Sequence, residues 1–342
     1  MHSGDICRNV ALMSYSNRIW LYGPIGLLLL LALLYSIFWR VQADMLAARL
    51  DRANGGEIVP GIVFAFAEKS IGGYPFRLDA VLSGVTLSHA GPNGQTAWRS
   101  EKLALHALTY GRDLYILEAA GRQTFEQPGD SGAPMRVVSL NPAVARASAI
   151  LSGRRLARFD LDLWQPEAKD ATQGAEPSRT LSAGRAQLHL LAHPDDTADI
   201  AMRIEEAKIG EGLRPMLGGE LSLVDLRGKL SKTGTLSALA TGSEDPTEAA
   251  EQWREAGGRL TVENLTLDWA GIKTALTGSI GLDTNHRPEG TLLGSFDAAK
   301  LIGALTHGGI NLPSMGERKF SLLFKDGDIK LGADSTLLGP AH

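Results

Sequence analysis

The stretch Phe159-Asp160-Leu161-Asp162-Leu163 alternates apolar and acidic side chains without a break. Successive side chains of a β-strand point to opposite faces, so this stretch presents one apolar and one charged face. The same period of two recurs at 76–80, 187–190 and 265–269, and turn signals lie at 91–94 and 325–328. Half-buried strands joined by tight turns predict a mostly β (α+β) fold. We expect a curved, mainly antiparallel sheet with a few short helices, preceded by a transmembrane helix.

The C-terminal half repeats a unit of strand, turn and strand with glycine at its corners. The unit recurs, without an exact period, at 218–230, 257–283 and 287–301. A meander that stacks such units extends along one axis. Its small, apolar inner face predicts a groove.

Short helices are expected at three places. Asp245 can cap a helix whose Glu248 follows three residues later, and Trp253 lies on its apolar face. This pattern predicts a helix near 246–256 that packs Trp253 on the sheet. The segments 298–306 and 141–152 are further helix candidates.

The run Ile19–Phe38 contains no charged residue in its 20 positions. As a helix rising ~1.5 Å per residue, it covers about 30 Å, the thickness of a hydrocarbon core. Aromatic residues at its two ends fit membrane-interface anchors: Trp20, Tyr22, Tyr35 and Trp39. The run therefore predicts a transmembrane signal anchor.

A cleaved signal peptide is the alternative, because Val41-Gln42-Ala43 resembles a cleavage site. The apolar run is longer than the ~7–15 residues of a signal-peptide core, which favours an uncleaved anchor. Basic residues flank the run on both sides and do not decide its orientation. A short tail before a signal anchor predicts a single-pass protein of the bacterial inner membrane, with most of the chain in the periplasm.

These assignments divide the chain into six segments. They are a cytoplasmic tail at 1–18, the transmembrane signal anchor at 19–39, a helical stalk at 40–55, an N-terminal β-rich region at 56–166, a loop or linker at 167–180, and a C-terminal β-rich region at 181–342. Whether the two β-rich regions are separate domains stays open, because the polar segment between them fits a loop as well as a linker.

Charge and cysteine content exclude several classes of protein. The 342 residues include 34 Lys and Arg against 38 Asp and Glu, a net charge of −4. A chain without a basic field is not expected to bind nucleic acid. The single cysteine, Cys7, excludes an internal disulfide framework and a cysteine-based zinc cluster.

The chain contains no recognised catalytic motif. His189 and His193 are four residues apart, which in a strand is about 13 Å of chain, so we expect them to face solvent rather than bind a metal. Asp160 and Asp162 share a strand face and could do acid–base chemistry. Their alternation with apolar residues is more typical of a solvated sheet face. We therefore expect no enzymatic activity, no metal and no cofactor.

The segment Tyr74-Pro75-Phe76-Arg77 is the one candidate for a binding motif. Structurally, Pro75 would fix the start of an edge strand that Tyr74 and Phe76 anchor. Functionally, Arg77 could face a phosphate or carboxylate headgroup at the mouth of a groove. A surface ion pair between Arg77 and Asp79 is the alternative, and the structural role is favoured.

Several of these segments resemble a known bacterial family. The segment 71–79, which contains Gly-Tyr-Pro-Phe-Arg, is similar to a signature of the "domain of unknown function 2125" family, and 253–269 resembles its second signature. The segments 287–290 and 325–340 also fit. The resemblance covers most of the chain after the anchor. It implies a single-span envelope protein with a β-rich exported domain, and it brings no catalytic residues. A more distant similarity to AsmA-like proteins implies a long β-groove linked to lipid handling.

Two functions are compatible with these features. The first is a non-enzymatic envelope factor whose apolar β-groove binds membrane lipids or a hydrophobic segment of another envelope protein. The second is an envelope hydrolase that uses acidic residues such as Asp160 and Asp162, which requires a strongly perturbed acid in a closed cleft. Because no unusual polar cluster stands out, the first function is favoured.

Overall fold

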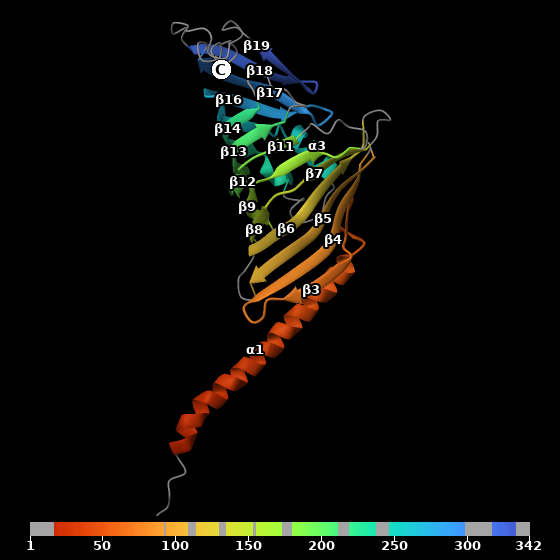
Figure 1. Ribbon diagram of the computed structural model, residues 1–342, viewed down its shortest axis with the longest axis vertical. Helices are drawn as coiled ribbons and strands as arrows, with labels where there is room; N and C mark the ends of the chain where they lie inside the picture. Colours follow the sequence, from red (N-terminus) through yellow and green to blue (C-terminus); the bar gives the residue numbers. More distant parts are fainter. Residues whose placement is uncertain are drawn as a thin grey trace, which may run out of the picture. The chain divides into compact units, whose positions relative to one another are not determined.

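A computed structural model shows one long helix followed by a large β-sheet (Figure 1). It describes residues 17–91, 94–108, 114–129, 135–152, 155–172, 180–210, 219–236, 246–297 and 317–332. The chain divides into two units, Met1–Ala48 and Arg49–His342.

Helix α1 (Asn17–Ala53) contains the whole apolar run. From Tyr22 onward it is long and apolar enough to cross a membrane. The leucine side chains between positions 27 and 34 are 51–66% exposed, which suits a surrounding of lipid rather than water. The helix continues to Ala53 and ends beside Gly55, whose φ of 79° is the left-handed conformation common after a helix.

Across the described ranges, nineteen strands form one sheet. They are β1 (Gly56–Val59), β2 (Ile62–Ala65), β3 (Glu68–Gly72), β4 (Arg77–Gly91), β5 (Gly94–Leu108), β6 (Leu114–Gln127), β7 (Arg136–Leu140), β8 (Val144–Ser152), β9 (Arg155–Trp164), β10 (Glu167–Asp170), β11 (Thr180–Ser182), β12 (Arg185–Ala192), β13 (Thr197–Ile209), β14 (Glu220–Ser231), β15 (Leu260–Trp269), β16 (Ile272–Leu282), β17 (Pro288–Asp297), β18 (Glu317–Lys325) and β19 (Asp328–Gly332).

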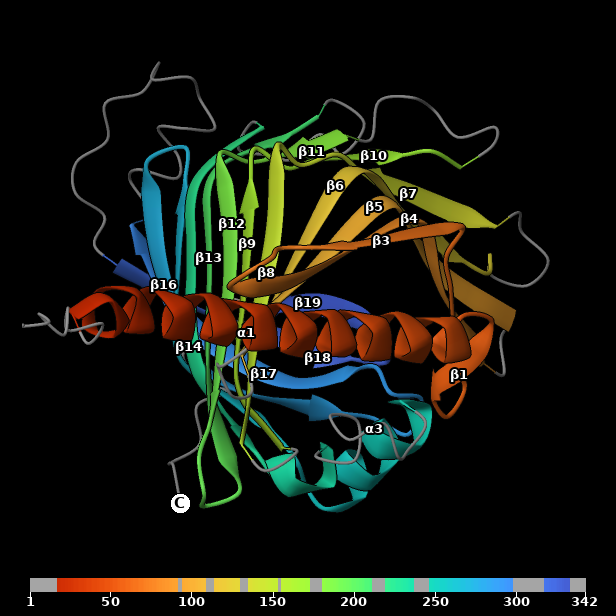
Figure 2. The same cartoon turned by 90° about the horizontal axis from the view of Figure 1, so that it is seen from below.

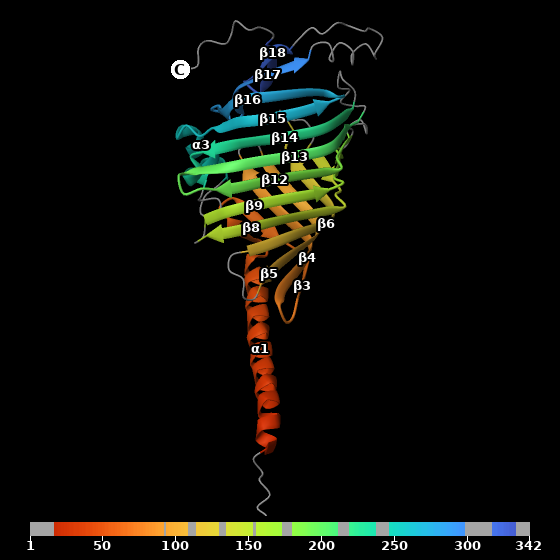
Figure 3. The same ribbon diagram turned by 90° about the vertical axis from the view of Figure 1, so that its left-hand side faces the viewer.

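Thirteen of these strands form a continuous antiparallel run in the order β4, β5, β6, β8, β9 and then β12 to β19. Figure 3 shows the strands from β8 to β17 stacked along one direction. Strands β2 and β3 both pair with β4, whereas β10 pairs with β7 and β11. The predicted antiparallel, mostly β fold is confirmed. The two-residue turn at Asp326 and Gly327 has positive φ at both positions, as a tight hairpin requires.

The structure corrects the sequence analysis at two segments. The helix candidate 141–152 is wrong, because Val144–Ser152 is strand β8. Its alanines have a high helix propensity, but they alternate with Arg146 and Ser148, and hydrogen bonding to β6 and β9 on both sides overrides the propensity. Within the predicted loop 167–180, residues 167–170 form strand β10. The helix candidate 298–306 lies outside the described residues.

Helix α3 (Pro246–Glu255) agrees with the helix expected near 246–256. Trp253 is 7% exposed, and its Nε1 donates a hydrogen bond to the carbonyl oxygen of Ser231 at 2.7 Å. A Cβ at Gly258 would lie 2.2 Å from the indole, so only glycine fits there. On the same helix, hydrogen bonds from the side chains of Arg254 and His286 lower the pKa of Glu251 to about 2.

Fully buried apolar side chains gather in two small clusters near the ends of the sheet. The first contains Phe66, Leu82 and Val85, and the second contains Val262, Leu276 and Leu292. Within the residues that the structure describes, these two small clusters cover only part of the apolar surface of the sheet.

Candidate functional site

One face of the sheet is apolar along the whole run of strands. A single row of directly opposed residues crosses twelve strands, with one residue from each strand: Ala80, Leu105, Leu117, Ala147, Leu161, Leu188, Met202, Leu226, Leu265, Leu276, Gly294 and Phe320. We call this row the apolar row, and the side of the sheet that carries it the apolar face. At ~4.8 Å between strands, the row is roughly 50 Å long.

The apolar row is fully buried at two positions, whereas its middle is only partly covered. Ala80 and Leu276 are 0% exposed. The seven residues from Leu117 to Leu265 are all of intermediate exposure. In Figure 2 the sheet curves so that β4–β6 and β13–β14 lie on opposite sides of its interior. The middle of the apolar face is therefore a partly sheltered surface of leucine, alanine and methionine side chains.

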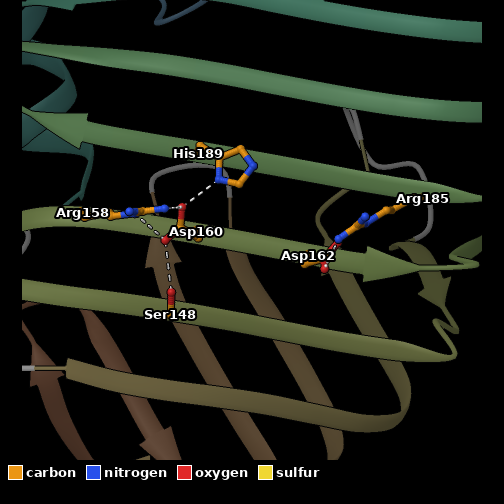
Figure 4. A network of polar contacts seen from close by, with 6 residues as sticks. All are labelled: Ser148, Arg158, Asp160, Asp162, Arg185 and His189. Carbon is orange, nitrogen blue, oxygen red and sulfur yellow. Dashed lines mark hydrogen bonds and ion pairs between the residues drawn. The ribbon is translucent and has the colours of Figure 1, made fainter.

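The opposite face, which we call the polar face, carries charged residues at the alternate positions of the same strands. Figure 4 shows Asp160 and Asp162 projecting toward the viewer, with strands of the N-terminal half behind the sheet. Nδ1 of His189 lies 2.7 Å from Oδ1 of Asp160, and Nε of Arg158 lies 2.8 Å from its Oδ2. Ser148 also donates to Oδ2, at 3.2 Å. Both carboxylate oxygens of Asp160 therefore have hydrogen-bond partners.

The two aspartates of this face are held in their charged form. Burial raises the pKa of Asp160, but hydrogen bonds from Arg158 and His189 outweigh it and keep the pKa below its ordinary value. Two hydrogen bonds of 2.8 Å from Arg185 lower the pKa of Asp162. A general acid of a glycosidase needs a raised pKa. Neither aspartate has this property.

The two histidines singled out in the sequence contact different aspartates. His189 contacts Asp160, whereas Nε2 of His193 lies 2.8 Å from Oδ2 of Asp199. In the part of the chain that the structure describes, no three His, Cys, Asp or Glu side chains come together in a way that could hold a metal ion.

The segment Tyr74 to Arg77 forms the turn between β3 and β4. Tyr74 is 54% and Phe76 65% exposed, so neither aromatic side chain is buried. Nη2 of Arg77 lies 3.2 Å from Oδ2 of Asp79, so the ion pair that the sequence analysis gave as the alternative is present. Nδ1 of His106 lies 2.7 Å from Oδ1 of the same aspartate. Arg77 belongs to the polar face, where it lines a cavity of about 510 Å³ together with Leu114 and Ile116.

The continuity of the apolar face is the feature that sequence reasoning missed. A groove was expected from the C-terminal half alone, but the apolar row extends back to β4. The signal was present in the alternating residues of 76–80 and 159–163. The continuous row could not be predicted from these residues alone, because it depends on the register that places Leu161 opposite both Ala147 and Leu188.

Of three comparisons with known proteins, the one with protein families gives a match. A search of curated proteins and a search of solved structures find none. A family model described as "Uncharacterized protein conserved in bacteria (DUF2125)" matches residues 39–333. The match contains both segments that resemble the family signatures, 71–79 and 253–269, and it begins at the end of the apolar run. The chain belongs to this bacterial family, DUF2125.

Proposed function

We propose that this protein is a non-enzymatic envelope factor, anchored in the bacterial inner membrane, whose apolar face binds the acyl chains of membrane lipids or a hydrophobic segment of another envelope protein. The observation that supports the proposal is the apolar row across twelve strands, with its half-exposed middle. A contiguous apolar surface without a covering layer is typical of an interaction site.

The energetics of the apolar face favour a ligand that covers several strands at once. Fully burying one leucine side chain contributes about 1.5–3 kcal/mol. The leucines of the row are already partly buried, so each offers only a fraction of that to a ligand that covers it. The row carries no charged side chain, so an acyl chain lying along it would meet no unpaired polar group. An extended, flexible hydrocarbon chain matches this surface better than a compact polar substrate does.

The hydrolase alternative has less support. It depends on acids such as Asp160 and Asp162, whose pKa values are lowered by neighbouring arginines. Asp160 also lines a cavity of about 570 Å³ on the polar face. Within that cavity Arg158 pairs with Asp160, and Lys229 lies 3.8 Å from Asp199.

The proposed function is tested by lipid recovery and photolabelling of the full chain. The protein is purified in mild detergent, its extracted lipids are identified by mass spectrometry, and a diazirine-labelled fatty acid is cross-linked in parallel. We expect cross-links in peptides of β6, β9 and β13, which carry the middle of the apolar row. Labels confined to α1, as found for any membrane anchor, would contradict binding by the sheet.

Membrane orientation is tested separately. We expect a C-terminal alkaline phosphatase fusion to be active, because the proposal assigns the sheet after the anchor to the periplasm. The matched control is a fusion at the same position to a fluorescent protein that matures only in the cytoplasm. Fluorescence together with an inactive phosphatase fusion would reverse the proposed orientation.

A further inference from the structure

A cavity of about 680 Å³ lies where the ends of β9, β12, β13 and β14 meet. Its volume is within the ~300–1,000 Å³ of small-molecule sites. Leu190 and Leu230 contribute apolar side chains, and Leu236 of the 3₁₀ helix η3 (Thr233–Leu236) adds a third. We call this cavity the end pocket.

The end pocket is deep because its floor is made of alanines. Ala192 lies directly opposite Ala198, and Ala198 lies opposite Leu230. The next rung of the same face instead places Leu190 between Phe159 and Ile200. The change from large to small side chains leaves a hollow at the end of the apolar face.

Helix η3 forms a fixed wall of the end pocket. The backbone N–H of Thr233 donates to the carbonyl oxygen of Asp196 at 3.2 Å, and the N–H of Gly234 donates to the Asp196 side chain. These contacts attach the turn after β14 to the turn before β13. Ala198 is consequently 1% exposed, although Ala192 on the same floor is only partly buried.

A cationic side chain lines the same cavity. Arg155 is exposed, and within the described part of the chain its side chain has no ion pair or hydrogen bond. Two other arginines of β9 and β12 differ, since Arg158 is paired with Asp160 and Arg185 with Asp162. The carboxylate that lines this pocket, Asp196, accepts a hydrogen bond from the Gly234 amide. An apolar hollow beside an available guanidinium suits an amphiphile with an anionic head.

We propose that the end pocket holds the headgroup-bearing end of an acyl chain, and that the anionic headgroup, a carboxylate or a phosphate, pairs with Arg155. This inference rests on the proposed function, because the rest of the chain would lie along the apolar face. It assigns the headgroup to one end of that face and defines the ligand class as an anionic, single-chain or multi-chain lipid.

The test of the hollow uses photolabelling of the full chain in detergent with a diazirine analogue of palmitate. We expect label in peptides that contain Ala192 or Leu230, and its loss in Ala192→Phe, which fills the cavity. Leu191→Phe is the matched control, since Leu191 is next to Ala192 on the same strand but lies on the polar face, is 47% exposed and does not line the pocket. Ala192→Leu is a milder filling variant in case the phenylalanine prevents folding, which circular dichroism would reveal.

The test of the headgroup compares Arg155→Gln with Arg136→Gln, an exposed arginine of β7 outside the described cavities. We expect Arg155→Gln to weaken palmitate binding about tenfold, the value of a charged hydrogen bond, and to leave an uncharged alcohol analogue unaffected. A phosphatidylglycerol analogue separates the two sources, since label by it but not by palmitate identifies a phospholipid phosphate.

The outcomes distinguish the two proposals. If the apolar face of Ala192→Phe and of Ala192→Leu is labelled as strongly as that of the wild type, the end pocket alone is overturned. Equal effects of Arg155→Gln and Arg136→Gln overturn the anionic headgroup. Absence of label from the whole apolar face overturns the proposed function itself.

Discussion

Met202→Glu is expected to reduce the lipid recovered with the purified protein by at least about tenfold. Met202 lies in the middle of the apolar row, directly between Leu188 and Leu226. A carboxylate there would face an acyl chain without a hydrogen-bond partner, and even a neutral polar group in that position costs about 2 kcal/mol or more. A loss of 1.4 kcal/mol is already tenfold in affinity. The measurement is the molar ratio of bound lipid to protein by mass spectrometry.

The neighbouring position supplies the matched control. Ala201 precedes Met202 on the same strand and therefore points to the polar face, opposite His189 and Arg227. A glutamate at 201 would meet basic partners, so Ala201→Glu should keep the wild-type lipid content. Because Met202 is only half-buried, both variants are expected to fold. Equal lipid content in the two variants would contradict binding on the apolar face, whichever way the content changed.

The contrast between these two neighbours shows which part of the architecture a single sequence can reveal. Alternation is a local property, so the side chains of 159–163 could be assigned to two faces from the sequence alone. The acids Asp160 and Asp162 were placed on the solvated face in this way, and the structure agrees. Strand β8 was misjudged because its alanines fit a helix equally well. Only the hydrogen bonds to β6 and β9 decide between the two conformations.

The register of distant strands could not be predicted in the same way. Leu117 and Ala147 are directly opposed although 30 residues separate them, with β7 inserted between their strands. Nothing in either segment specifies that pairing. The apolar row and the end pocket are both products of such pairings. The sequence therefore predicted a groove in the C-terminal half but neither its full length nor the hollow at Ala192 and Ala198.

The ion pairs also divide into those that a single strand allows and those that depend on the pairing of distant strands. Arg158 and Asp160 are two residues apart on one strand, so their ion pair is a local feature that alternation allows. The pairing of Arg185 with Asp162 crosses from β12 to β9 and needed the structure. The lowered pKa values of the two aspartates depend on both kinds of contact. Their unsuitability as general acids could be argued only after the fold was known.

Trp253→Ala is expected to destabilise the protein by roughly 3–5 kcal/mol, the usual cost of truncating a buried aromatic side chain to alanine. Trp253 is 7% exposed, and the glycine at 258 leaves room for its ring. The variant removes both the packed indole and the 2.7 Å hydrogen bond to Ser231, which joins α3 to the end of β14. The measurement is denaturant unfolding of the full chain in detergent.

Trp253→Phe separates the two contributions. It keeps an aromatic ring in the pocket but loses the Nε1 hydrogen bond, so about 1–3 kcal/mol should be lost because the Ser231 carbonyl is left without this donor. Helix α3 could instead open by itself while the sheet stays folded, in which case amide exchange would be accelerated in 246–255 alone. Global unfolding of Trp253→Ala at lower denaturant, with exchange also accelerated in β14 and β15, is the result we expect. An unchanged unfolding midpoint would mean that α3 does not stabilise the sheet.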